Sequence, residues 1–300
     1  MSGYKETFER KEVKYLLGWK QYEALRRRLS PYVEEDAYGK TQILNIYFDT
    51  PDFRLVRRSL EKPAYKEKLR LRTYRIPDDD TTAFVEIKKK YRGIVYKRRI
   101  DMTYRQAIDY LCHGIEAPQR SQISDEIDYF LTFYRQIVPA MKIRYERIAM
   151  AGRFDPELRI TFDRNLQWSM NLDLQDTEEG VPILDGNQIL MELKVQGAIK
   201  PAIADILNEL AIYPVSFSKY GRGFEMYSQQ KKKIPAEGEF KYARHTFFIN
   251  HCIRNANAVF VFSGDAGFSG TRTSHILLFS SDKTVLAKLC DHTRASSRNC

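Results

Sequence analysis

Residues 65–74 read YKEKLRLRTY, a segment in which cationic and apolar side chains alternate. Side chains on a β-strand point to opposite faces with period two, so the cations share one face, and Leu69 and Leu71 share the other. The cations of this face are Lys66, Lys68, Arg70 and Arg72. Any surface strand hides its apolar face, so a single segment of this kind decides little.

The same alternation recurs in four further segments, at residues 84–90, 94–100, 158–163 and 189–195. If these strands close into one barrel, their charged faces line a common interior. An interior dense in Arg and Lys, with a few carboxylates, suits a polyanion together with a metal ion. The pattern therefore predicts the architecture and the chemistry of the site at once.

The composition is typical of a soluble globular protein: 43% of the 300 residues are hydrophobic and 29% are charged. No apolar run approaches the roughly 20 residues that a membrane span requires. The N-terminus has no apolar signal segment, so we expect a cytoplasmic protein. Four Cys without a CxxC spacing indicate neither a disulfide framework nor a zinc site.

The net charge of +10 is unevenly distributed along the chain. Residues 229–300 hold 11 Lys and Arg against 5 Asp and Glu, which leaves a net charge of only +4 for residues 1–228. The main body is therefore not a general polycation. Its cations are expected to form a focused pocket, and we expect no nucleic-acid surface.

Periodicity and turn residues predict eight strands, over residues 4–15, 42–49, 65–75, 83–91, 94–102, 141–149, 158–164 and 188–196. They predict helices over 18–29, 104–112, 124–137 and 201–210, and a helix that starts near Pro51. Arg92-Gly93 is a tight turn between two strands, which demands antiparallel pairing. The expected fold class is therefore α+β: an antiparallel eight-stranded tunnel barrel, closed so that no edge is exposed, with surrounding helices.

The last part of the chain differs in kind from the rest. Three of the four Cys and four of the five His lie in residues 229–300, without metal-ligand spacing, and Ser, Gly and Asn clusters break any periodicity. We predict two regions: a tunnel domain over 1–228, and a tail over 229–300 that is disordered or loosely packed.

Seven short motifs occur in the order and spacing of one protein family. They are FERKEVKY (8–15), LRLRTY (69–74), FVEIK (84–88), YERIA (145–149), LRITFD (158–163), LMELK (190–194) and FSKY (217–220). Together they resemble the VTC-type polyphosphate polymerase domain, a CYTH-like branch of the triphosphate tunnel metalloenzymes. The resemblance covers roughly residues 4–224 and implies a stand-alone form without SPX or transmembrane domains.

The resemblance implies a tunnel that binds ATP through its phosphates, with Mn²⁺ or Mg²⁺, and that transfers the terminal phosphoryl group onto inorganic polyphosphate. The implied phosphate clamp, or catalytic set, is Arg70, Arg72, Lys88, Arg147 and Arg159. The implied substrate-binding set is Lys11, Lys14, Arg99, Lys194 and Lys219, with Glu192 holding the metal. Such residues fit the chemistry, because phosphoryl transfer asks a protein mainly for positioning and charge neutralisation.

Several alternatives remain open at this point. Glu192 could be a simple ion-pair partner of Lys194, and the residues do not decide whether Lys97 or Arg99 faces inward. In the eukaryotic polymerase a second Lys precedes the FSK motif, and here that position is Ser216. Of the paired glutamates that open the hydrolase branch, only the second, Glu9, is kept. Triphosphate hydrolysis and non-catalytic polyphosphate binding therefore stand as alternatives to polymerisation. The oligomeric state and a separate membrane partner are also left open.

Overall fold

The computed structural model describes residues 10–92, 94–233, 259–261 and 277–279. The expectations for residues 4–9 and for most of the tail lie outside these ranges. The chain divides into two compact units, Met1–Pro235 and Ala236–Cys300, which we describe separately.

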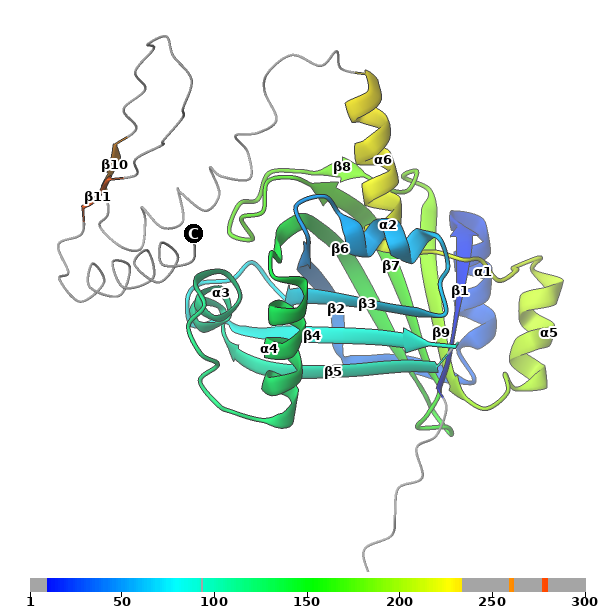
Figure 1. The fold of residues 1–300 in the computed structure, drawn as a ribbon. Coiled ribbons are helices and arrows are strands. Elements are labelled where there is room, and N and C mark those ends of the chain that lie inside the picture. The colour runs from blue at the N-terminus through cyan, green and yellow to red at the C-terminus, as the bar shows by residue number, and fades with distance from the viewer. Residues whose placement is uncertain (1–9, 93, 234–258, 262–276, 280–300) are drawn as a thin grey trace, which may run out of the picture. The chain divides into compact units, whose positions relative to one another are not determined.

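The first unit is built on one antiparallel sheet (Figure 1). Its strands are β1 (Arg10–Gly18), β2 (Val33–Asp49), β3 (Tyr65–Thr73), β4 (Thr82–Tyr91), β5 (Ile94–Thr103), β6 (Val138–Gly152), β7 (Arg159–Ser169), β8 (Val181–Pro182) and β9 (Gln188–Gln196). Their order is β1-β9-β7-β6-β2-β3-β4-β5, with the short β8 added to β7. The predicted α+β class and antiparallel tunnel fold are confirmed.

Six helices among the described residues surround this sheet (Figure 1). They are α1 (Trp19–Leu29), α2 (Arg54–Leu60), α3 (Tyr104–His113), α4 (Gln122–Tyr134), α5 (Pro201–Glu209) and α6 (Lys219–Lys233). Within the described part of the chain, no helix has the length and apolar character needed to cross a membrane.

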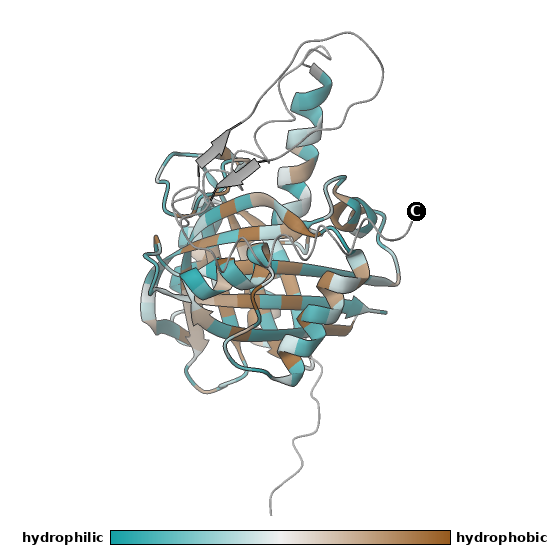
Figure 2. Ribbon diagram, turned by 60° about the vertical axis from the view of Figure 1, so that its left-hand side comes forward, coloured by the Kyte–Doolittle hydropathy of each residue, from teal (hydrophilic) through white to brown (hydrophobic). Residues whose placement is uncertain are grey.

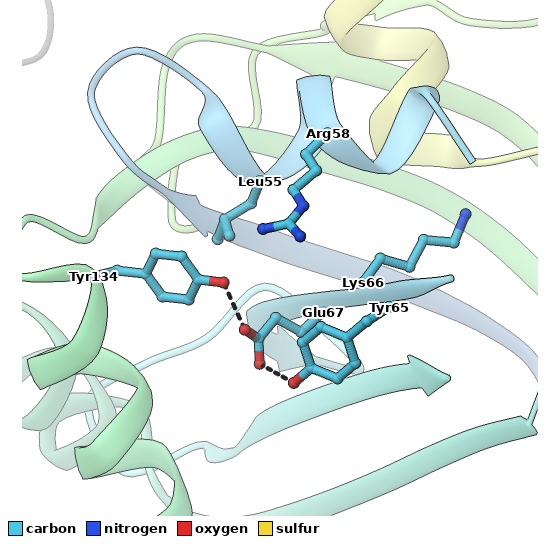
Figure 3. A pocket seen from close by; sticks show the side chains of 6 residues that line it. All are labelled: Leu55, Arg58, Tyr65, Lys66, Glu67 and Tyr134. Atoms are coloured by element: carbon cyan, nitrogen blue, oxygen red, sulfur yellow. Dashed lines mark hydrogen bonds between the residues drawn. The ribbon is translucent and has the colours of Figure 1, made fainter. Parts of the chain in front are cut away.

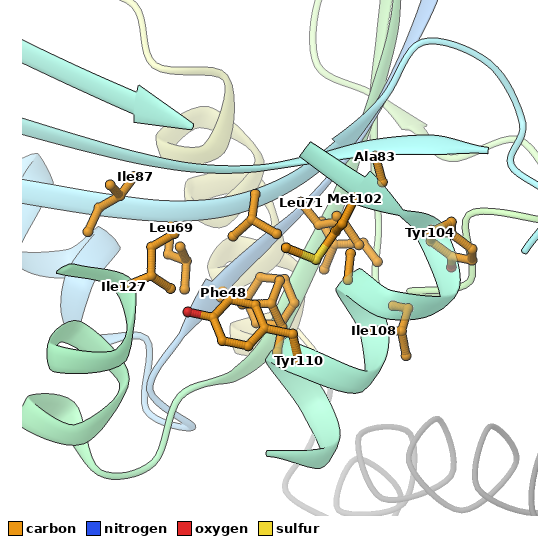
Figure 4. Packing of buried hydrophobic residues seen from close by; sticks show 14 of the residues in the cluster. Phe48, Leu69, Leu71, Ala83, Ile87, Met102, Tyr104, Ile108, Tyr110 and Ile127 are labelled. Atoms are coloured by element: carbon orange, nitrogen blue, oxygen red, sulfur yellow. The ribbon is translucent and has the colours of Figure 1, made fainter. Parts of the chain in front are cut away.

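The outer face of the sheet is apolar because alternate residues of each strand are apolar. Leu69 and Leu71 of β3 are fully buried against α3 and α4, in a cluster that includes Phe48 and Ile127 (Figure 4). A second cluster lies beneath α1 and α5 on the other half of the sheet, with Leu17 and Leu193 at its centre. Hydropathy bands alternate along the strands accordingly (Figure 2). Burial of these faces leaves the intervening cations on the inner face.

The sheet curls until its two edges approach, but β1 and β5 are not paired by backbone hydrogen bonds among the described residues. The Lys88 ammonium of β4 lies 3.6 Å from Glu12 of β1, so side chains span the gap. The free edge of β1 is instead covered by the segment before α6, where the Val215 amide donates to the backbone carbonyl of Lys14 at 2.7 Å. The tunnel is therefore completed by side chains and this segment, and the predicted closure by strand pairing is corrected.

Helix α6 packs against the end of the inner face where β6 and β7 turn apolar. This third cluster contains Met141, Ile143, Trp168 and Tyr220. Gly223 permits the close contact, since a Cβ there would come within 2.8 Å of the Met141 sulfur and 3.1 Å of Trp168 Cβ. The inner face is therefore charged toward one end and filled by apolar side chains at the other.

Several strands extend a few residues beyond their predicted bounds, such as β7, which ends at Ser169 rather than at residue 164, and three differences are larger. Strand β2 begins at Val33 rather than near residue 42, and the short β8 was not predicted. Helix α6 was also not predicted, and it continues to Lys233, so a boundary at residue 228 would cut through it. In the second unit, β10 (Val259–Val261) pairs antiparallel with β11 (Leu277–Phe279).

Candidate functional site in the tunnel

Two predicted clamp residues, Arg70 and Arg72, lie side by side on the inner face of β3. The register sets Arg70 opposite Tyr47 and Glu86, and sets Arg72 opposite Asn45. Arg70 Nε donates to Glu86 at 2.6 Å, and its Nη1 donates to the Tyr47 hydroxyl at 3.1 Å. Both guanidinium planes are thus held in fixed orientations, which is what fork-like recognition of phosphate requires.

Arg72 is held by uncharged partners. Its Nε donates to Asn45 Oδ1 at 2.9 Å and its Nη2 donates to the Tyr145 hydroxyl at 3.1 Å, while Glu86 lies 3.7 Å away. Only 5% of Arg72 is exposed, so its position is fixed by packing as well as by hydrogen bonds.

Glu86 is the counter-ion of this arginine pair. The carboxylate is buried, contacts Arg70 and Lys97 at 2.6 Å each, and lies on the same face as both. Burial alone would raise its pKa, but attraction to Arg70, Arg72 and Lys97 outweighs it and holds the pKa well below the usual range. Glu86 is therefore ionised at every pH at which the protein is expected to work.

A second group of charges joins β6, β7 and β9 to the start of α6. Arg147 donates to both oxygens of Asp163, at 2.6 and 2.7 Å, and the Lys219 ammonium lies 2.6 Å from the same carboxylate. Lys219 also donates to Glu192 Oε1 at 2.9 Å. We call Arg147, Asp163, Glu192 and Lys219 the paired group.

Glu192 contacts three further cations at longer range: Arg147 at 3.6 Å, and Lys14 and Lys194 at 3.8 Å each. Burial would raise the pKa of Glu192, but Lys219 and Arg147 lower it well below its ordinary value. Burial likewise opposes ionisation of Asp163, and Arg147 and Lys219 keep its pKa low. Both carboxylates are therefore charged and fully neutralised by cations.

A third group of cations has few carboxylates near it. We call Lys66, Lys68 and Lys88 the lysine cluster. The Lys68 ammonium donates to Ser218 Oγ at 2.9 Å, and no carboxylate of the described residues lies within ion-pair distance of it. Burial, and then the charges of Lys14, Lys66, Lys88 and Arg70, lower the pKa of Lys68 to about 7. An anion placed here would relieve this repulsion.

The remaining predicted residues lie at the rim or outside the tunnel. Arg159 begins β7 on the inner face but is exposed, and Lys194 lies beside it in the register. Lys14 faces inward and donates to the Phe217 carbonyl at 3.0 Å. Lys11 pairs with Val195 and lies on the opposite face from Lys14, because the two lysines are three positions apart on one strand. The expectation that Lys11 lines the tunnel with Lys14 is corrected.

Both Lys97 and Arg99 face inward, whereas the sequence left open which of the two does so. They are two residues apart on β5 and share the inner face. Lys97 contacts Glu86, and the Arg99 guanidinium lies over the Phe84 ring at 4.6 Å. Burial lowers the pKa of Lys97 to about 8, although Glu86 acts in the opposite direction. Arg98 points outward and contacts Glu126 at 3.4 Å.

The comparison with protein families identifies the family to which the chain belongs. The profile of the VTC domain matches residues 9–228, which is most of the chain. The chain belongs to the VTC domain family. No curated protein sequence matches the chain.

Several solved structures resemble the VTC domain at low identity. A Bacillus halodurans protein assigned as an adenylate cyclase is 14% identical, covers 71% of this chain and 94% of its own, and has a TM-score of 0.45. A Hippeastrum protein assigned as an adenylyl cyclase, with a dominant triphosphatase activity, is 14% identical over 72% of this chain and 95% of its own, at a TM-score of 0.43. The capping-enzyme triphosphatase of Mimivirus is 9% identical over 68% of this chain and 89% of its own, at a TM-score of 0.30.

The VTC domain contains site residues that were not in the predicted set. They are Glu12, Asn45, Tyr47, Lys66, Lys68, Glu86, Lys97, Tyr145, Asp163 and Ser218. Seven of them carried a usable signal, because strand alternation places each on one face with a predicted residue two or four positions away. They are Glu12, Lys66, Lys68, Glu86, Lys97, Tyr145 and Asp163. Asn45 comes from β2, where no predicted site residue lies, and carried none.

The donors that could hold a metal ion are oxygen atoms of the paired group. Among the described residues, no cluster of three or more His, Cys, Asp and Glu side chains could bind a metal. Asp163 and Glu192 both lie within hydrogen-bond distance of Lys219 Nζ. The buried Thr161 hydroxyl, directly opposite Glu192, has no hydrogen-bond partner in the part of the chain that the structure describes. Two carboxylates and a hydroxyl are hard oxygen donors that fit Mg²⁺ or Mn²⁺, provided that substrate phosphates complete the coordination.

A small pocket outside the tunnel has a different character (Figure 3). It lies between α2, β3 and the end of α4, and Leu55, Arg58 and Lys66 contribute to its wall. The hydroxyls of Tyr134 and Tyr65 both donate to Glu67, at 2.6 and 2.9 Å. Its central group is thus a carboxylate with satisfied hydrogen bonds, which does not attract phosphate.

Proposed function

We propose that the tunnel of this VTC domain binds the phosphates of ATP and of inorganic polyphosphate, and transfers the terminal phosphoryl group of ATP onto the polyphosphate chain. The cations of the tunnel have the right character for this substrate, since arginines supply forked donors and lysines supply point charges. The family resemblance of the motifs supports the choice of reaction.

One observation carries the proposal: the charge at Lys68 is unsatisfied. Its ammonium contacts only a hydroxyl among the described residues, and the neighbouring charges that lower its pKa are those of Lys14, Lys66, Lys88 and Arg70. Repulsion of this kind costs folding free energy, so it needs a compensating ligand. Consecutive phosphates present one negative charge or more per unit, and would neutralise Lys66, Lys68 and Lys88 together.

The arginine pair supports transfer rather than binding alone. Arg70 and Arg72 are fixed by Glu86, Asn45 and Tyr145 before any ligand arrives. Donors that are already oriented stabilise charge developing in a transition state without further reorganisation. A sleeve that merely bound polyphosphate would not need such rigid partners.

A divalent metal, Mn²⁺ or Mg²⁺, would be held by Glu192 and Asp163 with phosphate oxygens. When bound, it would neutralise charge on the transferring group and its leaving group. Arg147, which contacts both carboxylates, orients them for this task.

The test is incubation of the full chain with ATP labelled on its terminal phosphate, in Mn²⁺ or Mg²⁺. Labelled polymer is the expected product, and Glu192→Gln is expected to abolish its formation. Glu126→Gln is the matched control, because Glu126 pairs with Lys89 and Arg98 on the outer face. Released phosphate without polymer would replace the proposal by triphosphate hydrolysis, and no turnover would replace it by binding alone.

A further inference from the structure

The two carboxylates best suited to a metal ion are already bridged by a cation of the protein. Lys219 Nζ lies 2.6 Å from Asp163 and 2.9 Å from Glu192. Its side chain is 8% exposed, and the ammonium also lies 4.8 Å from the centre of the Tyr145 ring. The ammonium thus occupies the position between the two carboxylates where a divalent ion would have to bind both.

The bridging lysine is held in place by the fold. Lys219 is the first residue of α6, and the next residue, Tyr220, donates its hydroxyl to buried Asp49 at 2.8 Å. Asp49 in turn accepts hydrogen bonds from the amides of Leu55 and Val56 at the start of α2. The first turn of α6 is therefore anchored to the sheet and to α2. This anchoring fixes the backbone of Lys219 so that its ammonium reaches the two carboxylates.

The remaining oxygens of the pair are also engaged. Arg147 takes both oxygens of Asp163 and lies 3.6 Å from Glu192. A free divalent cation entering this site would meet two fixed positive charges at contact distance, and such repulsion is strong away from bulk water. The Thr161 hydroxyl of this site has no hydrogen-bond partner among the described residues.

We propose that Lys219 is a tethered counter-ion that keeps free divalent metal out of the Asp163–Glu192 pair until a phosphate chain draws its ammonium away. The phosphate chain then binds without needing the metal, and the ligand-free protein has little metal affinity. This inference rests on the proposed function, because it assigns phosphate as the group that releases Lys219.

The direct test is titration of Mn²⁺ into phosphate-free protein, followed by the loss of the electron paramagnetic resonance signal of the free ion. Wild type is expected to leave the signal unchanged. Lys219→Met keeps the length of the side chain and removes its charge, and is expected to bind Mn²⁺ at least about tenfold more tightly. Adding Asp163→Asn to that variant is expected to abolish the gain.

Lys97→Met is the matched control. Lys97 also pairs with a buried carboxylate, Glu86, but no second carboxylate of the described residues contacts it. This variant is expected to gain no Mn²⁺ binding. An equal gain in both lysine variants, or tight Mn²⁺ binding by wild type, would overturn the inference.

Two further measurements keep the inference testable if Lys219→Met folds poorly. Mn²⁺ is expected to raise the melting temperature of that variant and not of wild type, because a ligand that binds only the native state stabilises it. In wild type, inorganic tripolyphosphate is expected to bind in the presence of EDTA. Binding only with metal would overturn the inference and keep the proposed function, whereas no binding under either condition would overturn the proposed function.

Discussion

The paired group and the lysine cluster lie on the same inner face and differ in charge balance: the paired group is neutral and the lysine cluster is positive. In the paired group, Asp163 and Glu192 are matched by Arg147 and Lys219 at distances down to 2.6 Å. In the lysine cluster, the Lys68 ammonium has one hydrogen-bond partner among the described residues, the hydroxyl of Ser218. The first region is complete without a ligand, and the second is not. This difference indicates where the protein supplies its own counter-ions and where the substrate must supply them.

The largest effect is expected from breaking the paired group. Asp163→Ala removes a buried carboxylate and leaves Arg147 and Lys219 without their shortest contacts, so it should destabilise the fold by about 3–5 kcal/mol. Urea denaturation of wild type and variant measures this loss. Glu34→Ala, which breaks the exposed pair with Arg153, should cost no more than about 1 kcal/mol. Similar losses for the two variants would mean that the paired group contributes no more than surface charges do.

The next largest effect is expected from the arginine pair, which lies between the two regions. Arg72→Ala should raise the activation free energy of turnover by about 2–4 kcal/mol, as the loss of one oriented donor does elsewhere. Arg72→Lys should recover only part of this, because the forked geometry is absent. Steady-state kinetics with ATP give the measurement, and Arg98→Ala on the outer face serves as control. Unchanged turnover in Arg72→Ala would show that the phosphates lie elsewhere.

The sequence predicted this architecture well because period-two alternation is enforced by burial. Leu69 and Leu71 must face α3 and α4, so Arg70 and Arg72 must face inward. The same rule, applied to β1, would have excluded Lys11. Helix α6 was missed because glycines such as Gly221 and Gly223 disfavour a helix in sequence-based prediction. The need for glycine comes from tertiary contacts, since a Cβ at Gly223 would collide with the distant Met141 side chain. Asp163 and Glu86 were missed because a search for phosphate ligands selects cations and overlooks the carboxylates that hold them.

A smaller effect is expected from the pH dependence of the lysine cluster. The pKa of Lys68 is lowered to about 7, so above that pH the ligand-free protein holds Lys68 largely neutral. Below pH 7 Lys68 is charged in both the folded and the unfolded state, and its burial costs folding free energy. Between pH 7 and the pKa of the unfolded state, about 10.5, Lys68 is neutral when folded and protonated when unfolded. The stability of the ligand-free protein should therefore rise with pH over this window. A bound polyanion favours the charged form. Tripolyphosphate binding above pH 7 should therefore take up a proton, and affinity should fall as pH rises.

Calorimetry in buffers of different ionisation enthalpy measures this proton uptake. Lys68→Met should lose most of the proton uptake. The uptake that remains should come from Lys97, whose pKa is about 8. Comparing wild type with the variant cancels the titration of tripolyphosphate itself. Equal proton uptake in both proteins would show that Lys68 is not near the phosphates.

The smallest effect is expected from the second unit. Deletion of residues 236–300 keeps all of α6 and removes the unit that begins at Ala236. The melting temperature and ATP turnover of the remaining chain should match those of the full chain. Insolubility or inactivity of the shortened chain would show that the tunnel depends on those residues.

The central claim is that phosphate binds the inner face beside the lysine cluster, and two neighbouring lysines of β4 test it most directly. Lys88 faces the tunnel, where it lies 3.6 Å from Glu12, and Lys89 faces outward, where it lies 2.6 Å from Glu126. The measurement is calorimetric titration of inorganic tripolyphosphate into wild type, Lys88→Ala and Lys89→Ala. The account predicts that Lys88→Ala weakens binding about tenfold or more, and that Lys89→Ala leaves it unchanged. Equal losses in the two variants, or a loss only in Lys89→Ala, would contradict it.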